Sequence, residues 1–290
     1  MQLTAFVLSF LVCALAAQAQ TAGPQDAERA EMREQVWRVP SADRATLMLT
    51  TVFRPPGEAR APLAIMNHGA VDTGRSSAPR QRHPNIASYL VSRGYVVAVP
   101  QRRGYGETGG SFAESIGPCS NPGYFETGLA TAADIRAALD YLRRQPFVAP
   151  DRSIVAGQSA GGWGALALAS TNPPGVAGYI NFAGGRGGRN TERTRGADQH
   201  GNCSASELVA AAGRYGATAR QPSVWIYAAN DLYFRPALAE QMFAAYTAAG
   251  APATYKPVSA FGQDGHTLAA RPEGRVLWQP VVAAFLDGLR

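Results

Sequence analysis

Apolar segments of two kinds alternate along most of the chain, separated by short runs of Gly, Pro and polar residues. Residues 95–99 are continuously apolar and mostly β-branched, which is typical of a strand buried on both faces. Residues 85–92 have helical spacing instead. Strands that alternate with helices predict right-handed crossovers and a mostly parallel sheet. We therefore expect one α/β domain in which helices flank a central sheet.

The same patterns assign the other elements. The predicted strands cover residues 46–54, 62–67, 95–99, 153–156, 176–182, 224–228 and 253–258. The predicted helices cover residues 85–92, 129–142, 161–169, 237–248 and 276–289. Residues 101–124 and 184–219 interrupt the alternation, and connections of that length are often functional loops or lids.

Residues 1–19 have the features of a signal peptide. They carry no charge, and the apolar run over residues 5–17 is too short to span a bilayer as a helix. Ala17-Gln18-Ala19 matches the A-x-A pattern of signal peptidase sites, although the usual positive n-region is absent. We expect cleavage after Ala19 and a secreted or periplasmic protein, with a polar arm over residues 20–44 and the main domain over residues 45–290.

The cysteines fit an exported chain. Cys13 follows Val12 inside the apolar run, where a lipoprotein signal has a small residue, so we expect no stable membrane anchor. Cys119 and Cys203 remain in the mature chain, and an oxidising compartment favours a disulfide between them. Such a bond would stabilise the fold by about 2 to 5 kcal/mol, mainly by restricting the unfolded chain. The alternative is two unrelated buried thiols.

Composition excludes a disordered chain and argues against a nucleic-acid partner. The 290 residues are 46% apolar and 17% charged, which allows a large buried core. A net charge of +6 could suggest an acidic partner. However, the basic residues are scattered, and all of them except Lys256 are arginines. This bias resembles an effect of coding-DNA composition more than a binding face, so we expect no nucleic-acid partner.

The strongest chemical signal is Gly157-Gln158-Ser159-Ala160-Gly161, which lies between a predicted strand and a predicted helix. A strand-to-helix turn this tight holds its central residue in a strained conformation, and glycines two places on either side leave room for the backbone. Ser159 would then project its hydroxyl above the edge of the sheet, at a helix N-terminus. The alternative is a Gly-rich turn with a solvent-exposed serine.

A serine hydroxyl acts as a nucleophile at neutral pH only beside a suitable base and a carboxylate that orients this base. We expect His266 to be the base, because its loop follows the last predicted strand and can reach over the carboxyl edge of the sheet. Asp231 follows the strand at 224–228 and is the preferred partner. The alternative is that Asp231 only caps a helix. Asp264 is an alternative, but it lies too close to His266 in sequence to approach the ring easily. The remaining histidines fit the role less well: His68, His83 and His200.

Negative charge on an attacked carbonyl oxygen needs preorganised donors. The backbone N–H of Ala160 at the helix N-terminus is one candidate. The second should come from the segment after strand 62–67, with Ala70 N–H preferred over Gly69 N–H, while the His68 ring pins this loop. Aromatic residues near predicted strand ends either line a substrate pocket or belong to the core: Tyr124, Phe125, Trp163, Tyr233 and Phe234. No cluster has zinc-ligand spacing, so we expect neither a metal nor an organic cofactor.

In order and spacing, these residues resemble the α/β-hydrolase superfamily, and in particular its compact, dienelactone-hydrolase-like branch. The resemblance extends over residues 45–290 and includes Arg103-Gly104-Tyr105-Gly106, a segment like the R-G-x-G stretch of many members. It implies short loop insertions instead of a large cap domain, and an acyl-enzyme at Ser159. Dienelactone hydrolases use a cysteine nucleophile, and His68-Gly69-Ala70-Val71 replaces the His-Gly-Gly-Gly motif of lipases. Their substrate should therefore not be transferred.

The expected function is an exported serine hydrolase that cleaves carboxylic esters, with a small-molecule or polymeric ester as its partner. One alternative is a serine peptidase or amidase like the prolyl oligopeptidases, although these carry a large extra N-terminal domain. The other is a non-catalytic binding protein on the same fold, which the presence of nucleophile, base and acid disfavours. Pocket shape depends on the two long connections, so the sequence does not select the acyl or the alcohol group.

Overall fold

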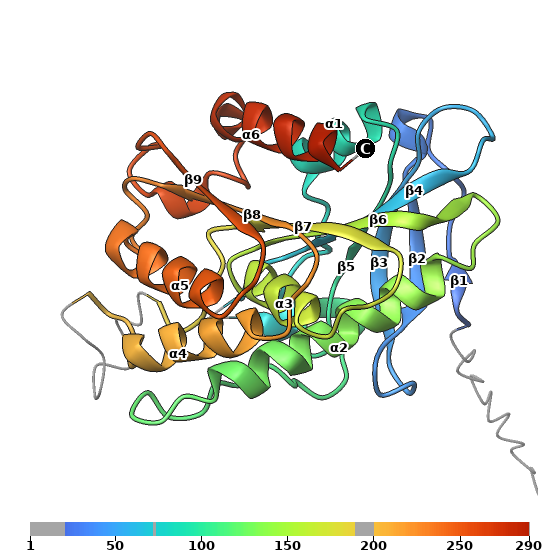
Figure 1. Ribbon diagram of the computed structural model, residues 1–290. Coiled ribbons are helices and arrows are strands. Elements are labelled where there is room, and N and C mark those ends of the chain that lie inside the picture. The colour runs from blue at the N-terminus through green and yellow to red at the C-terminus, as the bar shows by residue number, and fades with distance from the viewer. Residues whose placement is uncertain (1–20, 72–73, 189–199, 290) are drawn as a thin grey trace, which may run out of the picture.

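The computed structural model describes residues 21–71, 74–188 and 200–289. The expected signal peptide, residues 1–19 with its cleavage site after Ala19, lies outside these residues. The described residues form a nine-stranded sheet in the order β1-β2-β3-β5-β4-β6-β7-β8-β9, and helices cover both of its faces (Figure 1).

The elements have the following bounds along the chain. The strands are β1 (Gly23–Pro24), β2 (Gln35–Pro40), β3 (Leu47–Phe53), β4 (Ala61–Asn67), β5 (Val96–Pro100), β6 (Val148–Gln158), β7 (Val176–Phe182), β8 (Ser223–Ala228) and β9 (Ala253–Val258). The α-helices are α1 (Pro84–Ser92), α2 (Tyr124–Leu142), α3 (Ala160–Ala169), α4 (Ala205–Gly216), α5 (Pro236–Ala248) and α6 (Arg275–Gly288). Short 3-10 helices are η1 (Glu31–Arg33), η2 (Arg75–Ser77), η3 (Gly106–Thr108), η4 (Gly265–Thr267) and η5 (Pro272–Gly274).

The sheet is antiparallel at one side and parallel over the rest. β1, β2, β3 and β5 pair antiparallel in that order. β5, β4, β6, β7, β8 and β9 pair parallel. This arrangement confirms the predicted mostly parallel sheet flanked by helices. Because parallel strands point the same way, the segments that follow β4, β6, β8 and β9 all leave the sheet at its carboxyl edge.

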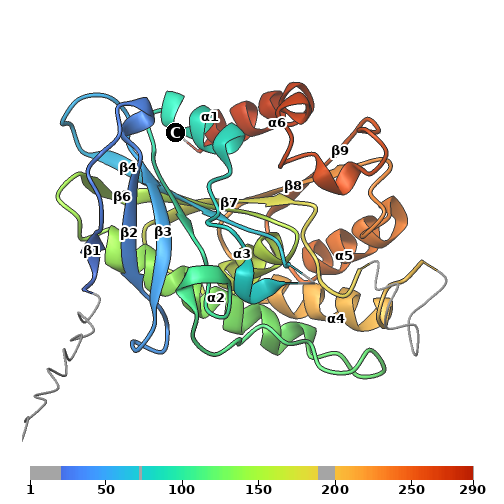
Figure 2. The same cartoon turned by 180° about the vertical axis from the view of Figure 1, so that it is seen from behind.

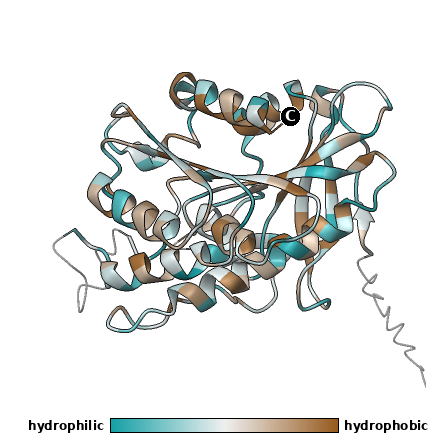
Figure 3. Ribbon diagram, in the orientation of Figure 1, coloured by the Kyte–Doolittle hydropathy of each residue, from teal (hydrophilic) through white to brown (hydrophobic). Residues whose placement is uncertain are grey.

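The helices form two layers around the sheet. α1 and α6 lie on one face, and α2, α3, α4 and α5 lie on the other (Figure 1, Figure 2). A buried apolar cluster lies on each side of the sheet. Figure 3 shows that the helices carry both polar and apolar residues, as expected where one face packs on a sheet and the other meets water. α3 is the exception, since all of its residues are buried.

The structure corrects the predicted arm over residues 20–44. β1 and β2 lie within this segment, and β2 pairs with β3 along its whole length. Trp37 and Val39 are buried in the core. Charged residues are frequent over residues 25–34, and they end where the apolar positions of β2 begin. The sheet therefore starts before the predicted boundary at residue 45.

The second long connection also differs from the prediction, because α4 lies within residues 184–219 and packs against α5. Cys119 and Cys203 form a disulfide, as predicted, and this bond joins the two long connections to each other. Across the described ranges, no helix has the length and apolar character needed to cross a bilayer.

Candidate active site

Ser159 lies at a sharp turn between β6 and α3. Its backbone has φ 54° and ψ −121°, a conformation that L-residues rarely adopt. The flanking glycines make this turn possible. A methyl group added at Gly157 would lie 2.3 Å from the backbone of Gly161, and one added at Gly161 would lie 2.3 Å from the carbonyl oxygen of Asn67. Any larger residue at either position would force the turn open.

The turn is also fixed by backbone hydrogen bonds. Ser159 N–H donates to the carbonyl oxygen of Phe182 at 3.0 Å, and Ser159 O accepts from Gly185 N–H at 3.2 Å. Ala160 is the first residue of α3, so its N–H has no acceptor within the helix. The positive end of the helix dipole therefore lies beside the Ser159 side chain.

His266 and Asp231 form a buried pair. His266 lies in η4 after β9, Asp231 lies after β8, and their relative exposures are 7% and 1%. His266 Nδ1 lies 3.0 Å from Asp231 Oδ2. Asp231 Oδ1 accepts from the backbone N–H groups of Tyr233 and Phe234, at 2.8 and 2.9 Å. The second carboxylate oxygen is thus held in place for the imidazole, which leaves Nε2 as the ring nitrogen that can take a proton from a substrate-side group.

Asp264, the alternative partner, performs a different task. Its Oδ1 accepts from the backbone N–H of His266 at 3.0 Å and from that of Leu232 at 3.1 Å. It therefore shapes the loop that carries His266 and ties this loop to the segment after β8. The structure brings Asp231, and not Asp264, to the imidazole Nδ1.

The segment after β4 reaches the same place. A methyl group added at Gly69 would lie 3.2 Å from Ser159 Cβ, so the backbone of Gly69 passes directly beside the serine. His68 is buried and pins this loop, because its Nε2 accepts from Arg102 N–H at 3.1 Å. Burial lowers the pKa of His68 well below its ordinary value, and the charge of Arg102 lowers it further, so the ring is neutral. Ala70 follows on the exposed side of the loop.

A buried cluster of charged residues, Arg102, Glu114 and Arg186, holds the loop of His68 in place. Arg102 donates to the carbonyl oxygen of His68 at 2.9 Å and forms an ion pair with Glu114. Glu114 also pairs with Arg186, at 2.5 Å. Burial raises the pKa of Glu114, but the two guanidinium groups outweigh this effect and hold the pKa well below its usual range. The cluster therefore links the first long connection, the second long connection and the loop of His68.

The five aromatic residues expected near the site divide into two groups. Tyr233 stacks on the His266 ring with 4.1 Å between ring centroids, and Phe234 makes an edge contact at 5.5 Å. Tyr124 and Trp163 are fully buried in the core, so of the two expected places the structure gives them the core and corrects the pocket-wall alternative. They lie on α2 and α3, and a position near a predicted strand end was a poor guide. Phe125 stacks on Tyr215 of α4 instead, at 4.9 Å.

Gln158 is a site residue that the sequence analysis did not single out. Its Nε2 donates to the backbone carbonyl of His266 at 3.2 Å, across 108 positions of sequence. This bond connects the residue before Ser159 directly to the residue expected to act as base. Among the described residues, Ser159 Oγ has no hydrogen bond to His266, which is common before substrate binds.

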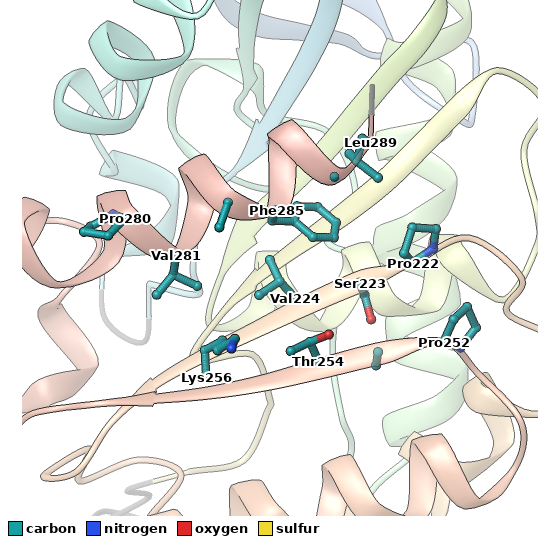
Figure 4. A pocket seen from close by; sticks show the side chains of 13 residues that line it. Pro222, Ser223, Val224, Pro252, Thr254, Lys256, Pro280, Val281, Phe285 and Leu289 are labelled. Carbon is teal, nitrogen blue, oxygen red and sulfur yellow. The ribbon is translucent and has the colours of Figure 1, made fainter.

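A separate cavity lies at the opposite edge of the sheet. It has a volume of about 740 Å³ and lies between α6 and the first residues of β8 and β9 (Figure 4). Its wall includes Val224, Val281 and Phe285, and Lys256 also contributes. Since the candidate site follows the carboxyl ends of the strands, this cavity is not part of it. Within residues 21–71, 74–188 and 200–289, no group of three His, Cys, Asp or Glu side chains is placed to hold a metal ion.

Comparison with known proteins finds one family model that matches part of the chain and solved structures of similar fold. The model of the prolyl oligopeptidase family matches residues 82–176. No curated protein shows significant sequence similarity to the chain. The acetyl xylan esterase of Paenibacillus sp. R4 superposes with a TM-score of 0.60 at 18% identity, covering 88% of this chain and 83% of that one. A Klebsiella pneumoniae protein assigned as a dienelactone hydrolase superposes with a TM-score of 0.56 at 16% identity. The match covers 84% of this chain and 95% of that one.

Larger peptidases share the same fold over part of their length. The acylaminoacyl peptidase of Pyrococcus horikoshii gives a TM-score of 0.58 at 14% identity, and the match covers 88% of this chain. The chain spans only 41% of that peptidase. At identities of 14 to 18%, these solved structures show a shared fold. The chain has the α/β-hydrolase fold, and its described residues include no large cap domain.

Proposed function

We propose that the protein is a serine hydrolase that cleaves carboxylic esters through an acyl-enzyme on Ser159. The observation that carries this proposal is the buried Asp231–His266 hydrogen bond at 3.0 Å, at the same sheet edge as the strained turn of Ser159. A carboxylate that fixes one imidazole nitrogen makes the other nitrogen available as a general base.

In the proposed first step, Ser159 Oγ attacks the ester carbonyl carbon while His266 Nε2 takes the hydroxyl proton. The carbonyl oxygen becomes negative and accepts hydrogen bonds from Ala160 N–H and from Ala70 N–H or Gly69 N–H. His266 then gives its proton to the leaving alcohol as the C–O bond breaks. Water, deprotonated by His266, attacks the acyl-enzyme, and the acid product leaves when Ser159 recovers the proton.

The fold match to the acetyl xylan esterase of Paenibacillus sp. R4 supports an ester substrate. A peptidase or amidase remains the second candidate, because the prolyl oligopeptidase family model matches residues 82–176. A non-catalytic binding protein would not need Asp231 fixed against His266. The proposed substrate is a small-molecule or polymeric ester.

We further propose that the protein acts outside the cytoplasm. The Cys119–Cys203 disulfide is compatible with an oxidising compartment. The signal peptide expected over residues 1–19 remains part of this proposal. N-terminal sequencing of the exported protein should give Gln20 as the first residue, and an intact Met1 on protein from the culture medium or periplasm would contradict it.

The test compares wild-type protein with Ser159→Ala. We expect the wild-type protein to hydrolyse short p-nitrophenyl esters faster than amino-acid anilides, and a fluorophosphonate to label Ser159 covalently. Ser159→Ala should lower kcat by about 10⁶-fold and abolish labelling while leaving the fold intact, because the nucleophile is lost. Retained turnover in this variant would refute the nucleophile assignment, and faster anilide cleavage would favour the peptidase.

A further inference from the structure

Gln158 lies between the two loops that the proposed reaction must bring together. It is the last residue of β6 and directly precedes Ser159. On one side, its Nε2 donates to the carbonyl oxygen of His266 at 3.2 Å. On the other side, its Oε1 lies against Gly69, where an added methyl group would approach it to 2.6 Å. One carboxamide thus contacts both the base loop and the loop that carries the expected oxyanion donors.

The partner fixes which way the carboxamide faces. A backbone carbonyl can only accept a hydrogen bond, so the NH₂ group of Gln158 must face His266 and its oxygen must face Gly69. The orientation is not interchangeable, because turning the amide over would place two oxygens against each other. Gln158 therefore has a defined donor side and a defined packing side.

The bond to Gln158 completes the support of His266. Asp264 Oδ1 accepts from the His266 backbone N–H at 3.0 Å, and Asp231 Oδ2 lies 3.0 Å from its Nδ1. Both aspartates belong to the segments that follow β8 and β9. Gln158 is different, because it belongs to β6 and moves with Ser159. Of these three contacts, it is the one that fixes the base relative to the nucleophile and not only relative to its own loop.

Packing at Gly69 supports the same role. The φ of Gly69 is not in the left-handed region, so its backbone would accept an alanine. A glycine is needed there for space, since a methyl group would strike Gln158 Oε1 at 2.6 Å and Ser159 Cβ at 3.2 Å. A side chain at this position would push the carboxamide and weaken its bond to His266. The close approach of Gly69 therefore depends on where Gln158 is held.

We propose that Gln158 is a positioning residue that holds the His266 main chain and the Gly69 loop at fixed places relative to Ser159. This inference rests on the proposed function, because it concerns the same reaction. Gln158 makes no bond to the substrate in this role. It acts by fixing the position of the base relative to the nucleophile, and misplacement of reacting groups by about 1 Å can cost about 100-fold in rate.

The experiment replaces Gln158 by residues of similar size that cannot donate to a carbonyl. Gln158→Met and Gln158→Glu at pH 8 should each lower kcat by about 10- to 100-fold, with KM changed less than about threefold. The matched control is Gln145→Met, because Gln145 Nε2 makes the same kind of bond, to Tyr141 O at 3.1 Å, at the far end of α2. The control should keep wild-type kcat. A kcat within twofold of wild type in both Gln158 variants would overturn the proposal.

Two further measurements separate positioning from general damage. Gly69→Ala alone should lower kcat, and in a Gln158→Ala background it should cost much less, since the clash with the carboxamide is gone. Strictly additive losses would contradict the coupling. Hydrogen exchange over residues 264–268 should speed up in Gln158→Met but not in Gln145→Met, and unchanged exchange would also overturn the proposal. A wild-type protein without ester turnover would contradict the proposed function. The hydrogen-exchange comparison needs no turnover, so it tests the role of Gln158 even in that case.

Discussion

At the scale of single residues, the candidate site has a strained backbone at the residue proposed as nucleophile. Ser159 holds φ 54° and ψ −121° because the turn leaves it no alternative, and the glycines two places away permit the close contacts. This turn places Ser159 at the N-terminus of α3 and leaves its side chain half-buried. In the proposed reaction the hydroxyl and the Ala160 N–H act on the same carbonyl group.

The choice between the two aspartates gives a prediction at this scale. Asp231→Asn should lower kcat by about 10⁴-fold, because an amide NH₂ at Oδ2 would force the wrong imidazole tautomer. Asp264→Asn should lower kcat by less than about tenfold, since its Oδ1 can still accept from His266 N–H and Leu232 N–H. Steady-state kinetics on both variants provides the measurement. If Asp264→Asn had the larger effect, the assignment of Asp231 as the orienting carboxylate would be wrong.

The sequence was informative about residues whose role is visible in a local motif. Ser159 stands in such a motif, and Asp231 and His266 lie in the segments that follow two predicted strands. Gln158 belongs to the same motif, but its partner lies 108 positions away and only the folded chain brings the two together. Tyr124 and Trp163 were misplaced for the opposite reason, because residues near a strand end in sequence can still point into the core.

At the scale of elements, the two long connections act as one unit. The Cys119–Cys203 disulfide joins them, and Glu114 of the first is ion-paired with Arg186 of the second. Cys203 N–H donates to Gly187 O at 2.9 Å, and Asn202 donates to the carbonyl oxygen of Tyr233 at 2.7 Å. The second connection is therefore fastened both to the first connection and to the residue that stacks on His266.

Removal of the disulfide should lower the stability of this unit. The double variant Cys119→Ser/Cys203→Ser should have a free energy of unfolding about 2 to 5 kcal/mol lower than wild type, because the unfolded chain gains freedom over a separation of 84 residues. Urea denaturation of both proteins, with and without dithiothreitol, tests this, and the reductant should affect only the wild type. Thiol titration of the unfolded, unreduced chain from Gln20 should find no free thiol. Two titrating thiols would show that the bond does not form.

Elements with strong periodicity were predicted well, and those in mixed segments were not. β7 and β9 have the predicted bounds, since continuous or alternating apolar residues end at clear turn residues. β2 was missed because it follows a charged stretch. α4 was missed because residues 184–219 begin with a Gly-rich run that reads as a loop. β2 is stabilised by pairing with β3, and α4 is stabilised by packing on α5. Neither contact is visible in the local sequence pattern.

At the scale of the whole molecule, the fold buries titratable groups around Arg102, which follows β5. His68 is 1% exposed, and the Nε2 atom of His83 is buried. Burial, and then the charge of Arg102, lowers the pKa of His83 to about 4 and that of His68 well below its ordinary value. Burial raises the pKa of Glu114, but the charges of Arg102 and Arg186 outweigh this effect and keep the pKa low. All three groups make the folded state bind fewer protons in acid than the unfolded chain does.

The folded protein should therefore lose stability as the pH falls. A histidine in the unfolded chain takes up a proton near pH 6.5, whereas His83 in the folded protein does so near pH 4. Between these values the unfolded state binds more protons, so the free energy of unfolding decreases with falling pH. The contribution of Glu114 is present above its unfolded pKa and is lost as the pH falls further. Urea midpoints at pH 8, 6 and 4.5 should fall in that order. In His83→Gln, the number of protons taken up on unfolding at pH 5 should be lower by about one. If the free energy of unfolding of this variant changed with pH as steeply as that of wild type, His83 would be excluded as a source of the acid sensitivity.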